Sequence, residues 1–140
     1  MRVVLDTNVI ISALARPASL PGQLLISWRK GQFTLLCCAE QLSEIRRVTR
    51  YVKVAALVAS SSAGRMVNQL RRDAAMIDHL PTIDRSPDPF DNYLLALAEA
   101  GRSDYLVTGD KADLLDLNRH RSTRIVSVRA LAEMLGIQAG

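Results

Sequence analysis

Two aspartates stand in the same local setting at opposite ends of the chain. Asp6 follows the apolar run 3–5, and Asp110 follows the run 105–109. Each run is typical of a short buried strand, and helical periodicity resumes after each aspartate. The carboxyl ends of parallel strands meet along one edge of a sheet, where ligands collect. Carboxylates that meet there repel each other unless a cation or a shared proton lies between them, and hard divalent cations such as Mg²⁺ prefer oxygen ligands.

A structural role alone would also explain the first aspartate. Asp6 or Asn8 can cap the helix that follows, because short polar side chains accept hydrogen bonds from the free N–H groups of a first helical turn. The second copy of the arrangement, at Asp110, favours a functional role for both acids.

A third acidic position lies in an expected helix that runs from residue 39 to about residue 51. Glu44 falls at the margin of its apolar stripe, which contains Leu42, Ile45, Val48 and Thr49. A solvated helix residue is the alternative for Glu44, and Glu40, one helical turn earlier, is a competing candidate. The two aspartates make Glu44 a plausible further ligand.

The fourth acidic position belongs to the segment 88–92. Asp88 stands where an N-cap is expected, Pro89 at the first helical position and Asp91 at the third, in an acidic variant of the capping box. A cap needs only one of these acids, so we assign Asp88 to the cap and Asp91 to the site. The helix is expected to end at Gly101 and to bury Phe90, Leu94, Leu97 and Ala98.

The elements that must position these acids alternate between strands and helices. Further strands are expected at 33–38, 76–80 and 124–127, with helices between them. This order predicts an α/β fold, with a central, mainly parallel sheet in a three-layer sandwich, and one domain over residues 1–140. Ser60, Ser61 and Ser62 are expected to precede and cap a helix that starts near residue 63.

Composition narrows the class of protein further. Hydrophobic residues make up 49% of the chain, yet the longest apolar runs are too short to span a bilayer, and the chain opens on a strand. We therefore expect a cytoplasmic protein with no membrane contact. A net charge of +4 suits a polyanionic substrate, although many small domains are mildly basic. Cys37 and Cys38 are expected in the core, and His79 and His120 at the surface or in loops.

Four short motifs, in this order and spacing, resemble the PIN domain from residue 1 to the last helix. They are Asp6-Thr7-Asn8, Glu44, the segment 88–92, and the segment 108–115. Among PIN domains, the chain is most similar to toxin components of bacterial toxin–antitoxin systems, relatives of the VapC toxins. The resemblance implies a Mg²⁺- or Mn²⁺-dependent endoribonuclease.

The resemblance also implies roles for individual residues. The family's four acids correspond to Asp6, Glu44, Asp91 and Asp110, which would bind the metal and serve catalysis. Asn8 and Thr108 correspond to polar residues that orient ligands and water, and Asp113 to a further acid near the metal. Asp113 can equally start the turn before Leu114 and Leu115. Candidate RNA phosphate contacts are Arg46, Arg47 and Arg50, and an ordinary solvated helix face explains any one of them equally well.

Partners and alternatives follow from the same comparison. The resemblance implies an RNA substrate, a small inhibitory antitoxin and a homodimer. One alternative is a catalytically silent nucleic-acid-binding or scaffold module that keeps the fold. The other is a metal-dependent phosphatase of the haloacid dehalogenase type, whose chemistry wants a second Asp where this chain has Asn8.

Overall fold

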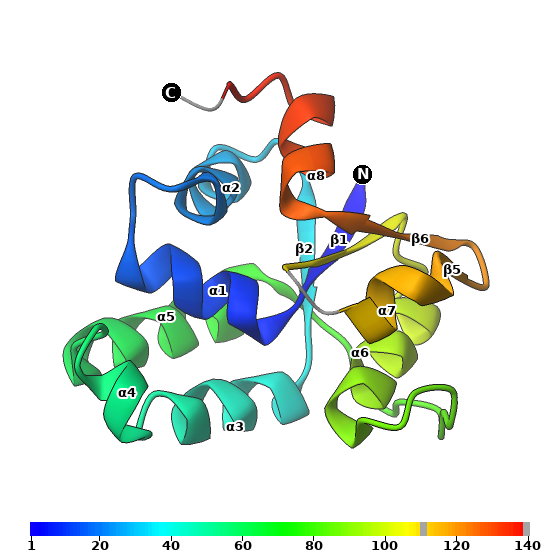
Figure 1. Cartoon of the computed structure of the whole chain (residues 1–140), viewed down its shortest axis with the longest axis horizontal. Helices are drawn as coiled ribbons and strands as arrows, with labels where there is room; N and C mark the ends of the chain where they lie inside the picture. The colour runs from blue at the N-terminus through cyan, green and yellow to red at the C-terminus, as the bar shows by residue number, and fades with distance from the viewer. Residues whose placement is uncertain (110–111, 139–140) are drawn as a thin grey trace.

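A mostly parallel sheet forms the middle layer of the computed structural model, which describes residues 1–109 and 112–138 (Figure 1). The strand order is β3-β2-β1-β4-β6-β5, and within this described part of the chain only β5 pairs in the antiparallel sense, with β6. The strands are β1 (Arg2–Leu5), β2 (Thr34–Cys37), β3 (Ala75–Met76), β4 (Tyr105–Thr108), β5 (Arg119–His120) and β6 (Thr123–Ser127).

Helices cover both faces of the sheet, so the predicted three-layer α/β fold is confirmed. One face carries α1 (Thr7–Ala15), α2 (Leu20–Arg29), α3 (Ala39–Val48), α5 (Ser60–Asp73) and α8 (Val128–Met134). The opposite face carries α6 (Pro89–Ala100) and α7 (Ala112–Leu117). The short helix α4 (Val52–Ala55) lies between α3 and α5 in the chain.

Alternating residues of the central strands contribute to two separate hydrophobic cores, one on each face of the sheet. In β1, Val3 and Leu5 pack with the helices of the larger layer, whereas Val4 packs against α6. Both faces are apolar because a parallel strand covered on both sides is buried throughout. This explains why the strands read as continuous apolar runs.

The strand register places the start of α1 at the carboxyl edge of the sheet. Leu5 pairs with Val107, and the Asp6 N–H donates to the Val107 carbonyl at 2.8 Å. Asp6 therefore lies beside Thr108, the last residue of β4. The adjacent strand β2 ends at Cys37, and α3 begins at Ala39 on the same edge.

Several boundaries differ from the sequence-based expectations. The expected strand at 76–80 is the two-residue strand β3, Ala75–Met76. The serine run lies inside the first turn of α5, with Ala59 as its N-cap, so the prediction that these serines precede the helix was wrong. Phe90 is 40% exposed, because it occupies the first turn of α6 beyond the buried stripe, so its predicted burial was also wrong.

The adjacent cysteines are buried, as predicted. Cys37 ends β2 and Cys38 is the N-cap residue of α3, and neither side chain has measurable exposure. Burial raises the pKa of the Cys37 thiol to about 12 and raises that of Cys38 as well. Both thiols therefore remain protonated at neutral pH and serve as small apolar core residues.

Within the described residues, no single helix is long and apolar enough to cross a membrane. Only α1 and α2 taken together meet the criterion of length and composition, and they are bent by 99° at their junction.

Candidate active site

Asp6 caps the helix that follows it and also makes a contact that the cap does not require. Its Oδ1 accepts a hydrogen bond from the Asn8 N–H at 3.2 Å, which makes it the N-cap of α1. Its Oδ2 accepts a second bond from the Thr108 hydroxyl at 3.0 Å. The side chain is only 1% exposed. A helix cap needs one carboxylate oxygen, so the bond to the neighbouring strand is additional and fixes the orientation of the carboxylate.

Glu44 is linked to the residue after Asp6 through a tyrosine. The Tyr93 hydroxyl of α6 donates to Glu44 Oε1 at 2.6 Å and lies 3.0 Å from Thr7 Oγ1. Because the single tyrosine proton goes to Glu44, Thr7 is the donor in the second bond. Burial, followed by the bond to Glu44, raises the pKa of Tyr93, so the phenol stays protonated at neutral pH.

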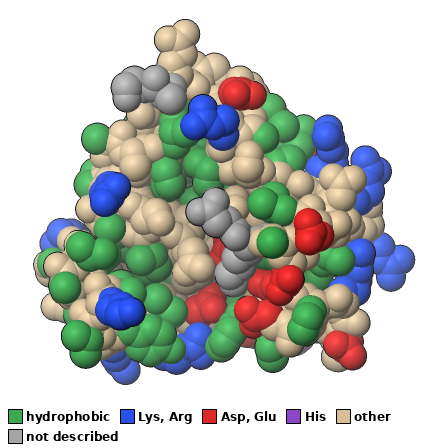
Figure 2. Space-filling view, viewed as in Figure 1, with side chains coloured by type: hydrophobic (Ala, Val, Ile, Leu, Met, Phe, Trp, Pro, Cys, Tyr) green, Lys and Arg blue, Asp and Glu red, His purple; other side chains and the backbone are tan. Residues whose placement is uncertain are grey.

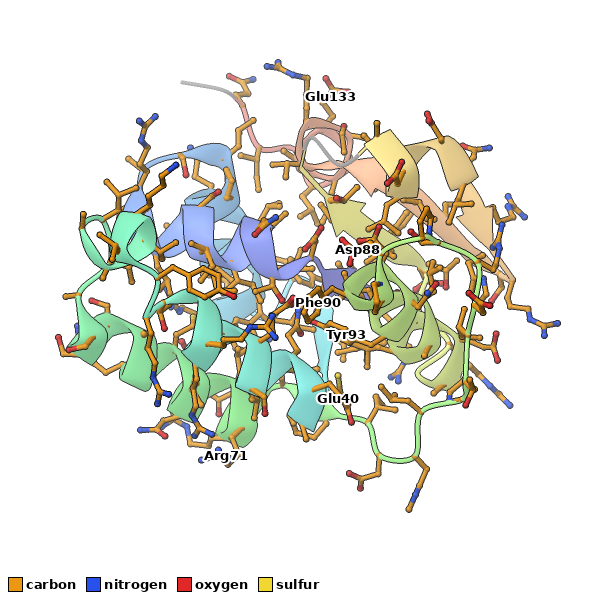
Figure 3. All side chains as sticks on the ribbon, turned by 60° about the horizontal axis from the view of Figure 1, so that its bottom comes forward. Glu40, Arg71, Asp88, Phe90, Tyr93 and Glu133 are labelled. Atoms are coloured by element: carbon orange, nitrogen blue, oxygen red, sulfur yellow. The ribbon has the colours of Figure 1, made fainter. Side chains whose placement is uncertain are left out.

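A buried glutamine completes this network. Gln41 Nε2 donates to the Leu5 carbonyl at 2.7 Å and lies 3.4 Å from Thr7 Oγ1. The network therefore ties α3, the end of β1, the start of α1 and α6 together at the edge where Asp6 lies. Figure 3 labels Tyr93 on α6, close to the ends of α1 and α3.

Asp91 is held by a loop that precedes its own helix. Its Oδ2 accepts a bond from the Ser86 hydroxyl at 3.0 Å, and the side chain is 1% exposed. Asn92 fixes Ser86 from both sides, since its Oδ1 accepts the Ser86 N–H at 2.9 Å and its Nδ2 donates to the Ser86 carbonyl at 2.9 Å. Asp88 caps α6 by accepting from the Phe90 N–H at 2.9 Å, so its predicted role as the cap is confirmed. The assignment of Asp91 to the site stays a prediction.

The described acids do not by themselves form a metal-binding cluster. Asp110 lies outside the described residues, and within residues 1–109 and 112–138 no group of three or more Asp, Glu, His or Cys side chains is arranged to hold a metal ion. Asp113 is exposed in the first turn of α7, and Asn8 is exposed at the start of α1. Glu40 is exposed as well, whereas the Glu44 side chain is 11% exposed, which favours Glu44 of the two.

The expected phosphate contacts are exposed on α3, and one of them has specific partners. Arg47 lies 3.7 Å from Glu44 and places its guanidinium carbon 4.3 Å from the centre of the Phe90 ring. Arg46 and Arg50 are exposed. Figure 2 shows acidic side chains gathered in the lower central part of one face of the molecule, with Lys and Arg mainly toward its rim.

Sequence reasoning missed Gln41, Tyr93 and Ser86 as supporting residues. Gln41 could have been predicted to make a structural hydrogen bond, because an amide on the apolar stripe of an amphipathic helix needs a buried partner. Tyr93 follows Phe90 by three residues, a spacing that places both on one side of α6. Ser86 carried no signal, since its contact depends on how the loop 81–88 folds back.

His120 is buried at 4% exposure, so the expectation of a surface or loop position was wrong. It lies in β5, where its Nδ1 is 2.8 Å from an Arg85 guanidinium nitrogen and its Nε2 is 2.9 Å from Glu99 Oε1. Arginine can only donate, so Nδ1 accepts and Nε2 carries the proton to Glu99. The contact of Arg85 with His120 anchors the loop that carries Ser86 to β5, the edge strand of the sheet. His79, in contrast, is exposed as expected.

The fold and this edge define an α/β domain with one buried carboxylate, Asp6, at the carboxyl end of a central strand and another, Asp91, in the first turn of α6. A family model described as PIN domain matches residues 2–112, and the chain therefore belongs to the PIN domain family. PIN domains are a family of nucleases that generally use divalent metals. No curated protein matches the chain.

The donor set at this edge is compatible with such a metal. Asp6 and Asp91 supply buried carboxylates, each with a hydroxyl donor that fixes one oxygen, and Glu44 is held by Tyr93. Hard oxygen ligands of this kind suit Mg²⁺ and Mn²⁺ rather than softer metals. The two cysteines near this edge, Cys37 and Cys38, are buried, and burial raises the pKa of both thiols, so they remain protonated at neutral pH.

Proposed function

We propose that this PIN domain is a divalent-metal-dependent endoribonuclease that hydrolyses RNA phosphodiester bonds. The observation that supports the proposal most directly is the double engagement of Asp6, which is buried, caps α1 and also accepts from Thr108. A carboxylate used only as a cap needs one oxygen for the helix N–H and no partner from a neighbouring strand. Holding a carboxylate rigid in this way is what a metal ligand requires.

Asp6 and Asp91 would bind the metal, with Glu44 as a further ligand, directly or through water, and Asp110 as the fourth acid of the family pattern. When bound, the metal would lower the pKa of its water and offset the charge that develops on the phosphate oxygens. The chain's own hydroxyls would keep the acids in place: Thr108 holds Asp6 and Ser86 holds Asp91.

The decisive experiment is cleavage of labelled single-stranded RNA in Mg²⁺ or Mn²⁺ by the wild type and by Asp6→Asn. Loss of an outer partner of a metal ligand already costs roughly 10- to 100-fold, so we expect Asp6→Asn to lose more than about 100-fold. Asp73→Asn, at the exposed end of α5, is the matched control and should cleave normally. Equal cleavage by Asp6→Asn and the wild type would assign the activity to a contaminant, and RNA binding without cleavage would support a silent module.

Asp110 requires its own variant. We expect Asp110→Asn to abolish cleavage while the fold stays intact, because removing one of several like charges relieves repulsion. Circular dichroism and thermal melting would check the fold. Unfolding of this variant would instead indicate a structural role.

We further propose that the domain is the toxin of a toxin–antitoxin pair and acts as a homodimer, on the basis of the family resemblance. An antitoxin would place a basic side chain against the acids at the sheet edge. Co-purification with the product of an adjacent reading frame, and loss of RNA cleavage in that complex, would support it. Light scattering on the purified chain would test the dimer.

A further inference from the structure

Two side-chain contacts join α3 to α6, and they differ in burial. The inner contact is Glu44 with Tyr93, which continues to Thr7 beside Asp6. The outer contact is Arg47 with Phe90. Arg47 lies about one turn after Glu44 in α3, and Phe90 lies about one turn before Tyr93 in α6. Figure 3 labels Phe90 and Tyr93 on the same side of α6, toward α1 and α3.

The outer contact remains open to solvent. Phe90 is 40% exposed and the Arg47 side chain is 45% exposed, although each already touches the other. Large exposed aromatic side chains are few in this chain, which is 4% aromatic. Phe90 is also adjacent in sequence to Asp91, so this aromatic surface borders the carboxylates of the proposed active site.

Arg47 is held from two directions before any ligand arrives. Glu44 Oε2 lies 3.7 Å from its guanidinium, and the Phe90 ring lies beneath the guanidinium carbon. A planar cation fixed in this way loses less conformational entropy on binding than a free arginine. Guanidinium planes and aromatic rings are both surfaces on which unpaired nucleobases stack, whereas bases in a duplex are already stacked.

We propose that Arg47 and Phe90 form a stacking subsite for one unpaired nucleobase that flanks the scissile phosphate. This inference rests on the proposed ribonuclease function and specifies its substrate as single-stranded RNA. The subsite would position the strand so that the neighbouring phosphodiester lies over the carboxylate edge. Arg46 and Arg50, exposed on the same helix, would then contact the phosphates further along.

The test uses single-stranded RNA that contains one 2-aminopurine, bound to full-length Asp6→Asn protein in Mg²⁺ so that the RNA stays uncleaved. Quenching of the fluorescent base reports stacking, and titration gives Kd. We expect Phe90→Leu and Arg47→Lys, each in the Asp6→Asn background, to abolish the quenching and weaken binding roughly 5- to 100-fold. Leucine keeps apolar bulk and lysine keeps the positive charge, while both variants remove the planar surface.

Two exposed residues elsewhere provide matched controls. Tyr51→Leu removes an aromatic ring that is 53% exposed, and Arg71→Lys changes an exposed arginine of α5. Both should leave quenching and Kd unchanged. Quenching that survives in both Phe90→Leu and Arg47→Lys would overturn the subsite, as would equal loss in the controls.

Cleavage assays with the four variants made in the otherwise wild-type protein, which keeps Asp6, separate this inference from the proposed ribonuclease function. If the wild type cleaves RNA and Phe90→Leu does so with unchanged KM and kcat, the subsite is wrong while the ribonuclease proposal stands. A raised KM with a smaller change in kcat is the expected result. Absence of both cleavage and RNA binding in the wild type would overturn both the ribonuclease proposal and the subsite. An RNA duplex that competes as well as the single strand would refute the preference for unpaired bases.

Discussion

At the scale of single residues, one hydroxyl group contributes to fixing the orientation of Asp6. Thr108 is fully buried at the end of β4, and its Oγ1 donates to Asp6 Oδ2 at 3.0 Å. A buried carboxylate oxygen that loses its donor is costly to leave unsatisfied. The same hydroxyl therefore contributes both to stability and to the geometry of the proposed site.

Replacing Thr108 with valine removes the hydroxyl and keeps the shape and the strand propensity. We expect the free energy of unfolding to fall by about 1–3 kcal/mol and cleavage to fall roughly 10- to 100-fold, since an outer partner of a metal ligand is lost. Urea denaturation and the RNA cleavage assay measure the two effects separately.

Thr123→Val is the control for this substitution. Thr123 is equally buried, lies in β6 and donates to the Ser103 carbonyl at 2.6 Å, away from the acids. It should lose similar stability and keep full activity per folded molecule. Parallel losses of activity in the two variants would mean that Thr108 acts through stability alone.

Single residues also show the limit of sequence reasoning. The positions of Asp6, Asp91 and Thr108 at the ends of strands and helices could be predicted, because the sequence marks those ends. Tyr93 and Gln41 could not be assigned, because their partners depend on which sides of α3 and α6 face each other. His120 was misjudged because its strand, β5, has only two residues and no periodicity to reveal it.

At the scale of secondary-structure elements, the turn between α1 and α2 has a strict spatial requirement. A Cβ on Gly22 would lie 2.0 Å from the Pro17 carbonyl oxygen, far inside van der Waals contact. Helix α2 begins at Leu20, and its first turn therefore packs directly against the backbone that precedes it. From sequence alone, Pro17, Pro21 and Gly22 indicate a break in helical periodicity but not this close contact.

Gly22→Ala and Gly64→Ala should change stability in opposite directions. At position 22 the backbone must move, so we expect a loss of about 1–3 kcal/mol, in the range for overpacked sites. At position 64, on the exposed face of α5, a Cβ meets nothing within 4 Å, and alanine should add about 0.5–1 kcal/mol through its helix propensity. Urea denaturation of both variants provides the comparison, and a stabilised Gly22→Ala would contradict the close contact.

At the scale of the whole molecule, the layers and the sheet edge could be predicted because both follow from alternation of strands and helices. Parallel pairing of β1 with β4 fixes Asp6 beside Thr108. What the alternation cannot specify is how the loop 81–88 crosses the end of α6 and reaches β5. That path is set by long-range contacts of Arg85 with His120 and of His120 with Glu99.

Glu99 makes the stability of the molecule depend on pH through this contact. Its burial opposes ionisation, but hydrogen bonds from His120 at 2.9 Å and Arg121 at 3.2 Å outweigh burial, and the net pKa of Glu99 is lowered from 4.5. A carboxyl whose pKa is lower in the folded state stabilises that state above the unfolded pKa. The contribution disappears as the pH falls through the lowered folded value.

Glu99→Gln keeps the shape and an acceptor oxygen but removes the charge. The wild type should therefore exceed this variant in free energy of unfolding at neutral pH, and the difference should shrink as the pH falls below 4.5. Urea denaturation across that range measures it, with Glu133→Gln on the exposed side of α8 as the matched control. A difference that stays constant from neutral to acid pH would show that Glu99 acts through packing, because the charge at position 99 is the titrating charge that only the wild type carries.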